Sequence, residues 1–245
     1  MPRHVQGLLA IIAIAAACGS TSPTQPSPAQ PIRVLMLTAT AGYRHDSIPA
    51  ARSTMADIAS KQGYVVNATE TLSEINASSL SATNVLMFAL TTGELAFDAS
   101  QKDAIVRFVE GGGGFVGVHS AADTLYNWSD YGRIVGAYFK DHPWTRQGTV
   151  TVEDSMHPAT AGLGPSFSLV EEFYTFRTNP RGTSHVLLSL DAASVGSQGD
   201  YPLSWTQTIG RGRSYYNALG HFDSTWTDPR FQNQLSAAVR WAAGR

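Results

Sequence analysis

Cysteine, net charge and long hydrophobic runs are all scarce in this sequence. Its 245 residues include a single cysteine, Cys18, so the chain can form neither an intrachain disulfide nor a metal site with two thiolate ligands. The formal net charge is −2, without the basic excess of a general nucleic-acid binder or of a membrane-binding stripe. The mean hydropathy of −0.10 excludes a polytopic membrane protein. With 43% hydrophobic residues, the chain can bury a substantial core, and no nucleic-acid partner is expected.

The N-terminus carries one short apolar run, residues 8–17, which follows Arg3 and ends in three alanines before Cys18. The run has the length of a signal-peptide core and is too short to cross a bilayer. Small residues before a lone cysteine resemble the lipobox of a bacterial lipoprotein, although Ala15 stands where leucine is commonest. The sequence therefore predicts export, with residues 1–18 as a signal peptide and Cys18 as the lipidation site that anchors the chain in the cell envelope, at the periplasm or the cell surface. The alternative is an ordinary secretory signal that leaves Cys18 as a free thiol.

A proline-rich segment follows the signal. Residues 19–31 read GSTSPTQPSPAQP, with four prolines and no charge. Such a segment cannot bury a core, so it is predicted to be an extended tether. Residues 32–245 remain, without an internal repeat or a second linker, and are predicted to form one domain.

Short apolar runs alternate with segments of helical spacing over the first half of this domain. Strands are predicted at residues 33–38, 64–68, 84–90 and 115–118, and then, in a second half richer in strands, at 149–153, 168–176, 186–190 and 214–219. Helix signals include Asp46 or Ser47 as a first cap and Gly63 as its stop, a capping box at Asp98, and Asp228 before the last helix. The alternation predicts an α/β fold, with a parallel sheet covered by helices on both faces.

One glycine motif is misleading. Residues 112–117, GGGFVG, match the dinucleotide-binding pattern G-x-G-x-x-G. That pattern binds phosphate only between a strand and the start of a helix, whereas these glycines follow a predicted helix and lead into a strand. They are predicted to end the helix in a tight turn, and they imply no nicotinamide cofactor.

The segment that follows is more informative. Residues 117–121, GVHSA, place His119 at the end of a buried strand, with small residues two positions to either side. This spacing is similar to a nucleophile elbow, in which a side chain is aimed off the sheet edge. Because ligands of open α/β sheets bind beyond the carboxyl ends of the strands, His119 is predicted to project into an open pocket.

The sequence resembles the ThuA-like family over nearly all of residues 32–244. The matching segments are, in order, GYRH at 42–45, FVEGGGGFVGVHSAAD at 108–123, DHP at 141–143, HP at 157–158, EEFY at 171–174, PLSW at 202–205, GR at 212–213, GH at 220–221 and RWA at 240–242. The resemblance implies a flavodoxin-like parallel sheet similar to that of class I glutamine amidotransferases. It implies a role with carbohydrates: trehalose or another disaccharide, plain or oxidised. Since a histidine stands where the amidotransferase cysteine would be, glutamine amidotransferase activity is not expected.

Four residues are predicted to carry acid/base chemistry. His45, His119 and His221 each follow a predicted strand, and Glu172 lies on an otherwise apolar strand face, where its pKa would be raised or a histidine would pair with it. His119 is the predicted base. The alternative is a purely structural role, in which the histidines hydrogen-bond to loop backbone and Glu172 pairs with Arg44 or Arg177. His142 can be read either way, while His157 and His185 are predicted to be structural.

A further set of polar and aromatic residues is predicted to bind substrate, since flat rings beside polar groups suit sugar faces. These residues are Tyr43, Arg44, Ser120, Asp123, Trp128, His142 and Trp144. No cofactor is required by this reading. A divalent metal such as zinc is the alternative, although no H-E-x-x-H spacing supports it.

Two functions follow from these residues. The first is an exported enzyme, a lyase, hydrolase or isomerase, that processes a sugar such as a 3-keto-glycoside: a base removes a proton next to the keto group. The second is a non-catalytic carbohydrate-binding lipoprotein on an amidotransferase-like scaffold. Either way the expected ligand is a small carbohydrate, and the sequence indicates no oligomeric state.

Overall fold

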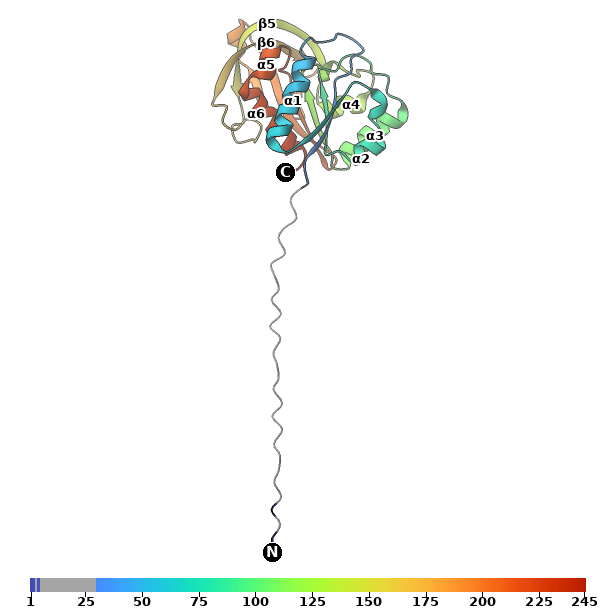
Figure 1. Cartoon of the computed structure of the whole chain (residues 1–245). Helices are drawn as coiled ribbons and strands as arrows, with labels where there is room; N and C mark the ends of the chain where they lie inside the picture. Colours follow the sequence, from blue (N-terminus) through green and yellow to red (C-terminus); the bar gives the residue numbers. More distant parts are fainter. Residues whose placement is uncertain (3, 5–29) are drawn as a thin grey trace. The chain divides into compact units, whose positions relative to one another are not determined.

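The computed structural model describes residues 1–2, 4 and 30–245. Lipidation at Cys18, and most of the predicted signal peptide and linker, lie outside these residues. The chain divides into residues 1–30 and a second unit, residues 31–245, which contains all the elements described below (Figure 1). None of the described helices is both long and apolar enough to cross a membrane.

One mixed sheet forms the centre of the second unit. Its strands are β1 (Arg33–Leu37), β2 (Val65–Thr69), β3 (Val85–Ala89), β4 (Gly114–Val118), β5 (Phe139–Val152), β6 (Ser166–Phe176), β7 (His185–Leu190), β8 (Pro202–Ile209) and β9 (Gly212–Asn217). Across the described residues their order is β2-β1-β3-β4-β9-β8-β7-β5-β6. The first five strands in this order pair in parallel, and the remaining pairs are antiparallel. The predicted α/β fold is confirmed, and its parallel sheet is extended by four antiparallel strands.

The antiparallel half departs most from the sequence prediction. β5 begins at Phe139 rather than at residue 149, and β8 was not predicted at all. The first half of β5 is polar and largely exposed, so it lacks the apolar run that marks a buried strand. Its register shifts around Asp141 and Pro143, as expected where a proline removes a ladder hydrogen bond.

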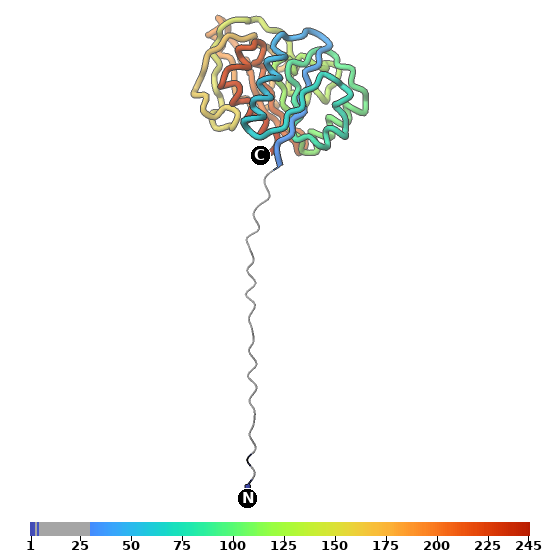
Figure 2. Tube along the Cα trace, in the orientation of Figure 1, coloured from blue at the N-terminus to red at the C-terminus, as the bar shows by residue number. Residues whose placement is uncertain are grey.

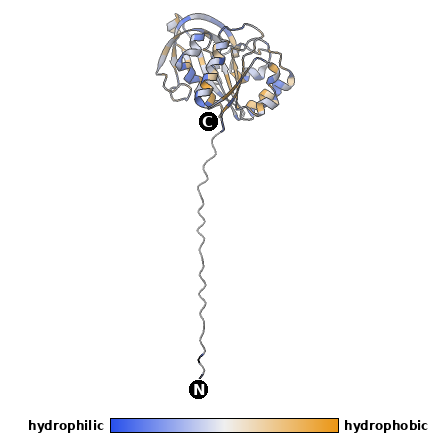
Figure 3. Cartoon of the chain, in the orientation of Figure 1, coloured by the Kyte–Doolittle hydropathy of each residue, from blue (hydrophilic) through white to orange (hydrophobic). Residues whose placement is uncertain are grey.

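Helices cover the sheet in two groups. They are α1 (Ile48–Gln62), α2 (Ala77–Ser81), α3 (Ala99–Glu110), α4 (Ser129–Val135), α5 (Asp223–Thr227) and α6 (Pro229–Ala242). Short 3₁₀ turns are η1 (Leu72–Glu74), η2 (His119–Asp123), η3 (Pro180–Gly182) and η4 (Ala192–Val195). α1, α5 and α6 contact one another, as α3 contacts α2 and α4, and Figure 1 shows these groups apart from each other. The helices carry both hydrophilic and hydrophobic stretches, as amphipathic surface helices do (Figure 3).

The predicted helix boundaries are largely confirmed. The Asp98 side chain accepts from Gln101 N and the Asp228 side chain from Arg230 N, while Gly63 ends α1 in the left-handed conformation. The cap of α1 is an exception: Ser47 makes no side-chain cap bond, and its hydroxyl donates instead to the Gly220 carbonyl, 3.3 Å away. This bond ties the start of α1 to the chain after β9, two segments that are far apart in sequence and lie side by side in Figure 2.

The glycine-rich segment is a turn, as predicted. α3 ends at Glu110, Gly112 has a φ of +116°, and β4 begins at Gly114. An L side chain rarely adopts that φ, so glycine is required there by the backbone and not by a phosphate.

Candidate functional site

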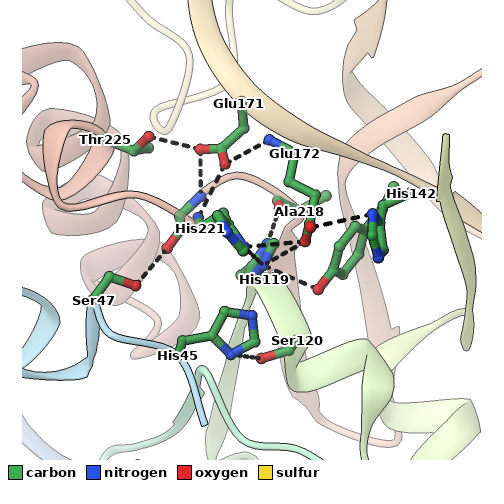
Figure 4. A network of polar contacts seen from close by, with 12 residues as sticks. His45, Ser47, His119, Ser120, His142, Glu171, Glu172, Ala218, His221 and Thr225 are labelled. Atoms are coloured by element: carbon green, nitrogen blue, oxygen red, sulfur yellow. Dashed lines mark hydrogen bonds and ion pairs between the residues drawn. The ribbon is translucent and has the colours of Figure 1, made fainter. Parts of the chain in front are cut away.

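Three histidines follow strands of the parallel half of the sheet. His45 follows β1, His119 directly follows β4, and His221 follows β9. Because these strands run in parallel and lie close in the sheet, their carboxyl ends meet along one edge. The rings point toward one another (Figure 4), with centroids 4.8 Å apart for His45 and His119 and 5.3 Å apart for His119 and His221.

A carboxylate from the antiparallel half completes this group. Glu172 of β6 places Oε2 3.1 Å from Nδ1 of His221 and 3.5 Å from Nε2 of His119. Its second oxygen, Oε1, lies 3.2 Å from Nδ1 of His142. We call these five residues, His45, His119, His142, Glu172 and His221, the histidine–glutamate cluster.

The alternative pairing of Glu172 with arginine is wrong. The Arg44 guanidinium makes two hydrogen bonds of 2.9 Å to Glu70. The Arg177 guanidinium lies over the Tyr126 ring, 3.9 Å from its centroid. Within the described residues, the partners of the Glu172 carboxylate are therefore imidazoles.

His119 adopts the sharp turn that the sequence indicates, but its ring is not exposed. Its φ is +53°, a strained value for a residue with a side chain, and its carbonyl accepts a 2.7 Å hydrogen bond from the Tyr216 hydroxyl. The residue is 0% exposed. The prediction that His119 projects into an open pocket is wrong, because Tyr174, Glu172 and His221 cover the ring.

The contacts of His119 determine which nitrogen carries its proton. Nδ1 lies 2.7 Å from the Ala218 carbonyl, which can only accept, so Nδ1 donates. In the neutral ring Nε2 is then an acceptor, and the Tyr174 hydroxyl donates to it at 3.0 Å. A carbonyl thus aims the Nε2 lone pair at the centre of the cluster.

Glu171 is a structural residue of the site that the sequence did not single out. Its carboxylate is 0% exposed and accepts four hydrogen bonds: from the backbone amides of Glu172, Gly220 and His221 and from the hydroxyl of Thr225. These bonds satisfy a buried charge and fix the segment that carries His221 (Figure 4). No spacing rule reveals them, because three of the four partners, Gly220, His221 and Thr225, lie about fifty positions away in sequence.

Burial and neighbouring charge set the protonation of the cluster. Burial raises the pKa of Glu172, but its contacts with the His119 and His221 imidazoles outweigh burial and hold that pKa well below its usual range. Burial lowers the pKa of His221, and its bond to Glu172 outweighs burial, so the net shift is upward. For His45, burial and the nearby imidazoles lower the pKa to about 3. Glu172 is therefore anionic and His45 neutral at pH 7.

A cavity of about 360 Å³ opens beside the cluster. It is lined by Tyr43, His45, Asp123, Phe139, His142, Glu172, Tyr174 and His221. A second hollow of about 400 Å³ shares Tyr43, His45 and His221 with it. Burial raises the pKa of Asp123 despite a 2.6 Å hydrogen bond from the Tyr126 hydroxyl. The cavity therefore combines imidazoles, two carboxyl groups and aromatic rings.

His142 is the most exposed histidine of the cluster, with 47% of its side chain accessible. It lies where the pairing of β5 with β6 shifts register. A register irregularity changes the direction in which a side chain points. Here it accompanies the contact of the His142 ring with Glu172. The ionised Glu172 carboxylate, whose Oε1 lies 3.2 Å from Nδ1, favours the proton on Nδ1, which leaves Nε2 of the neutral ring unprotonated.

Several predicted substrate-binding residues lie elsewhere. Ser120 is buried and lines neither hollow, with Oγ 3.5 Å from Nδ1 of His45. Arg44 pairs with Glu70 and lines neither hollow beside the cluster, and Trp128 packs on Tyr131. Trp144 lines a separate cavity of about 410 Å³, where its ring meets Tyr201 edge-on.

The sequence and the fold both have known relatives. The family model described as "ThuA: Trehalose utilisation" matches residues 33–242. The chain belongs to the ThuA family. A ThuA-like protein from Bacteroides uniformis has a TM-score of 0.74 at 24% identity, over 90% of this chain and 95% of that one. A second, from Parabacteroides merdae, has a TM-score of 0.71 at 19% identity, over 87% and 90% of the two chains.

The ThuA fold also resembles an amidotransferase-type scaffold, as the sequence predicted. A GMP synthase component from Thermoplasma acidophilum has a TM-score of 0.58 at 10% identity, over 88% of this chain and 96% of that one. A likeness at this identity shows the fold alone. Among curated proteins no match is found. For this ThuA chain, family membership implies a role in trehalose utilisation.

Proposed function

We propose that this ThuA chain processes an oxidised disaccharide, a 3-keto-glycoside, by proton transfer at the histidine–glutamate cluster. The observation that carries the proposal is the His142–Glu172 pair, an imidazole oriented by a carboxylate at the wall of an open cavity. The family description supports the substrate class. A base must reach the proton that it removes, and the His119 ring is buried. We therefore assign the role of base to His142 in place of His119.

The proposed reaction is a β-elimination. Nε2 of His142 takes the proton from a carbon beside the keto group, and the C–H electron pair forms an enolate whose oxygen lies toward His45 and His221. Collapse of the enolate expels the glycosidic oxygen from the next carbon. That oxygen takes a proton from Asp123, an acid of the same cavity whose pKa is raised. Proton return to the first carbon, without elimination, would give epimerisation.

We further propose that this chemistry takes place outside the cytoplasm, on a chain tethered to the cell envelope through lipidated Cys18. The apolar run, the small residues before Cys18 and the uncharged proline-rich segment support this proposal. Labelling with a radioactive fatty acid tests it: the wild type is expected to incorporate the label and Cys18→Ala is not. Equal labelling of the two chains would contradict it.

Turnover tests the proposed reaction. The purified full-length chain is incubated with 3-keto and unoxidised disaccharides, and products are followed by mass spectrometry. We expect cleavage of the keto-sugar alone, and a loss of kcat of about 10²–10⁴-fold in His142→Ala. His185→Ala is the matched control, because His185 pairs with Asp154 away from the cavity.

The rival function gives a different result. A carbohydrate-binding protein without catalysis would bind these sugars, turn over none of them, and lose no affinity specifically for the keto form in His142→Ala. That outcome would overturn the proposed enzyme and leave the cavity as a binding site.

A further inference from the structure

Four side chains of the cluster bring metal-binding atoms to one point. His45, His119, Glu172 and His221 each offer one ligand atom, and these atoms all lie within 4.8 Å of one another. Three of the residues are buried and His221 is half-buried. Imidazole nitrogen and carboxylate oxygen are the ligands that Zn²⁺ and similar divalent transition metals accept in proteins.

The spacing of three of these atoms fits a coordination polyhedron. Nε2 of His119, Nδ1 of His221 and Oε2 of Glu172 form a triangle with sides of 3.1, 3.3 and 3.5 Å. Ligands at about 2.0–2.1 Å from a tetrahedral zinc ion are about 3.4 Å from each other. The triangle therefore has the dimensions of one face of a zinc tetrahedron.

Hydrogen bonding alone leaves this triangle incompletely explained. Because His119 donates through Nδ1 to Ala218, its neutral Nε2 is an acceptor; the Tyr174 hydroxyl donates to it at 3.0 Å, and it faces a second acceptor, Oε2 of Glu172, at 3.5 Å. The one Nδ1 proton of His221 serves one of these two atoms at a time. A cation between the three atoms would instead take one lone pair from each, with the Nδ1 proton of His221 released and the Tyr174 hydroxyl turned away from Nε2 of His119.

The outer contacts also match those of a metal site. Metal-binding histidines usually donate their other ring nitrogen to a carbonyl or another polar group, which fixes the ring. His119 does so through Nδ1 to Ala218, and Nδ1 of His45 lies 3.5 Å from Oγ of Ser120. Figure 4 shows the second nitrogen of His45 facing the cluster.

We propose that His119, Glu172 and His221, with His45 as the fourth ligand or beside an open fourth position, bind one divalent transition metal ion, with Zn²⁺ as the best fit. Since His45 and His221 also line the cavity, an oxygen of a bound sugar can approach the ion. There the ion would polarise the keto group and stabilise the enolate oxygen as a Lewis acid. This role rests on the proposed function, whereas metal binding itself does not.

Metal binding is measured without sugar. The full-length chain is stripped with a chelator, dialysed and titrated with Zn²⁺, Co²⁺ or Mn²⁺, with the bound metal counted by elemental analysis and affinity measured by calorimetry. We expect one Zn²⁺ per chain, a rise in Tm, and at least an about 100-fold weaker affinity in His221→Ala and in the near-isosteric Glu172→Gln. His185→Ala, which changes an exposed histidine elsewhere, is expected to bind as the wild type does.

The outcomes separate the two proposals. A folded wild type that binds no stoichiometric metal overturns the site, as does binding that both cluster variants retain. Because the first result needs no variant, the test stands even if a variant fails to fold. One bound Zn²⁺ with no turnover of any keto-sugar keeps the metal site and rejects the proposed function; turnover by a wild type that binds no Zn²⁺ keeps the proposed function and overturns the metal site.

Discussion

The two halves of the sheet contribute different things to the site. The parallel half, β2-β1-β3-β4-β9, supplies three histidines, one after each of three strands. The antiparallel half supplies Glu171 and Glu172 from β6 and His142 from β5. Parallel strands end together, so their histidines meet through topology alone. The carboxylates instead lie within the long strand β6 and not at a strand end. They reach the histidines because the antiparallel strands extend the same sheet beyond the parallel ones.

The largest expected effect concerns the link between these halves. Glu171 of β6 binds the backbone of Gly220 and His221, which follow a strand of the parallel half. Glu171→Gln replaces an acceptor oxygen with an NH₂ group that faces buried donors. We expect a loss of about 2–3 kcal/mol in the free energy of unfolding, measured by urea denaturation. The exposed Glu74→Gln is the control, with a change within about 0.5 kcal/mol. Equal stabilities would show that the halves are held together by other contacts.

A smaller effect is expected in the cavity that belongs to the antiparallel half alone. Trp144 and Tyr201 present their rings there, and Tyr174 lines both this cavity and the one beside the cluster. If the second sugar unit of the substrate extends into it, Trp144→Ala raises KM about tenfold with kcat nearly unchanged. Steady-state kinetics with a keto-disaccharide measure this. An unchanged KM would confine the substrate to the cavity beside the cluster.

The smallest effect is a pH-dependent contribution to stability, also from the antiparallel half. The Arg181 guanidinium binds Glu153 and Asp200, and it holds the pKa of both carboxyls below their ordinary values. A lowered pKa in the folded state stabilises the fold above the ordinary pKa, and this contribution is lost as the pH falls through the folded value. Because these groups are partly exposed, Arg181→Met is expected to cost only about 1 kcal/mol at pH 7.

Thermal unfolding from pH 7 down to pH 2 checks this contribution. The stability difference between the wild type and Arg181→Met should shrink as the pH falls below about 4. A difference that stays constant or grows toward low pH would contradict the assigned ion pairs. Arg107→Met, which removes an exposed pair with Asp103 on a helix, is the control with an effect of about 0.5 kcal/mol or less.

The sequence predicts the parallel half well and the antiparallel half poorly, for a physical reason. Buried parallel strands are continuous apolar runs, such as residues 85–89 of β3, where every residue is buried. The ends of such runs then locate His119 and His221. β5 starts with a polar, largely exposed stretch, and β8 alternates polar and apolar residues, so neither gives that signal.

The site itself could be predicted in part. Residue types and strand ends point to His45, His119, Glu172 and His221, and the structure brings these four together. The complete burial of His119, the register shift at His142 and the hydrogen bonds by which Glu171 fixes the segment of His221 all depend on tertiary packing. The sequence carries no local signal for them.

Proton exchange is the sharpest test of acid/base chemistry at the histidine–glutamate cluster. The wild-type chain and Glu172→Gln are incubated with a 3-keto-disaccharide in D₂O, and deuterium on the carbon beside the keto group is measured by mass spectrometry and NMR. We expect rapid incorporation or cleavage by the wild type and a rate at least about 100-fold lower in the variant, which lacks the negative charge that faces His142, His119 and His221. No exchange above the enzyme-free rate in the wild type, or an unchanged rate in Glu172→Gln, would contradict it.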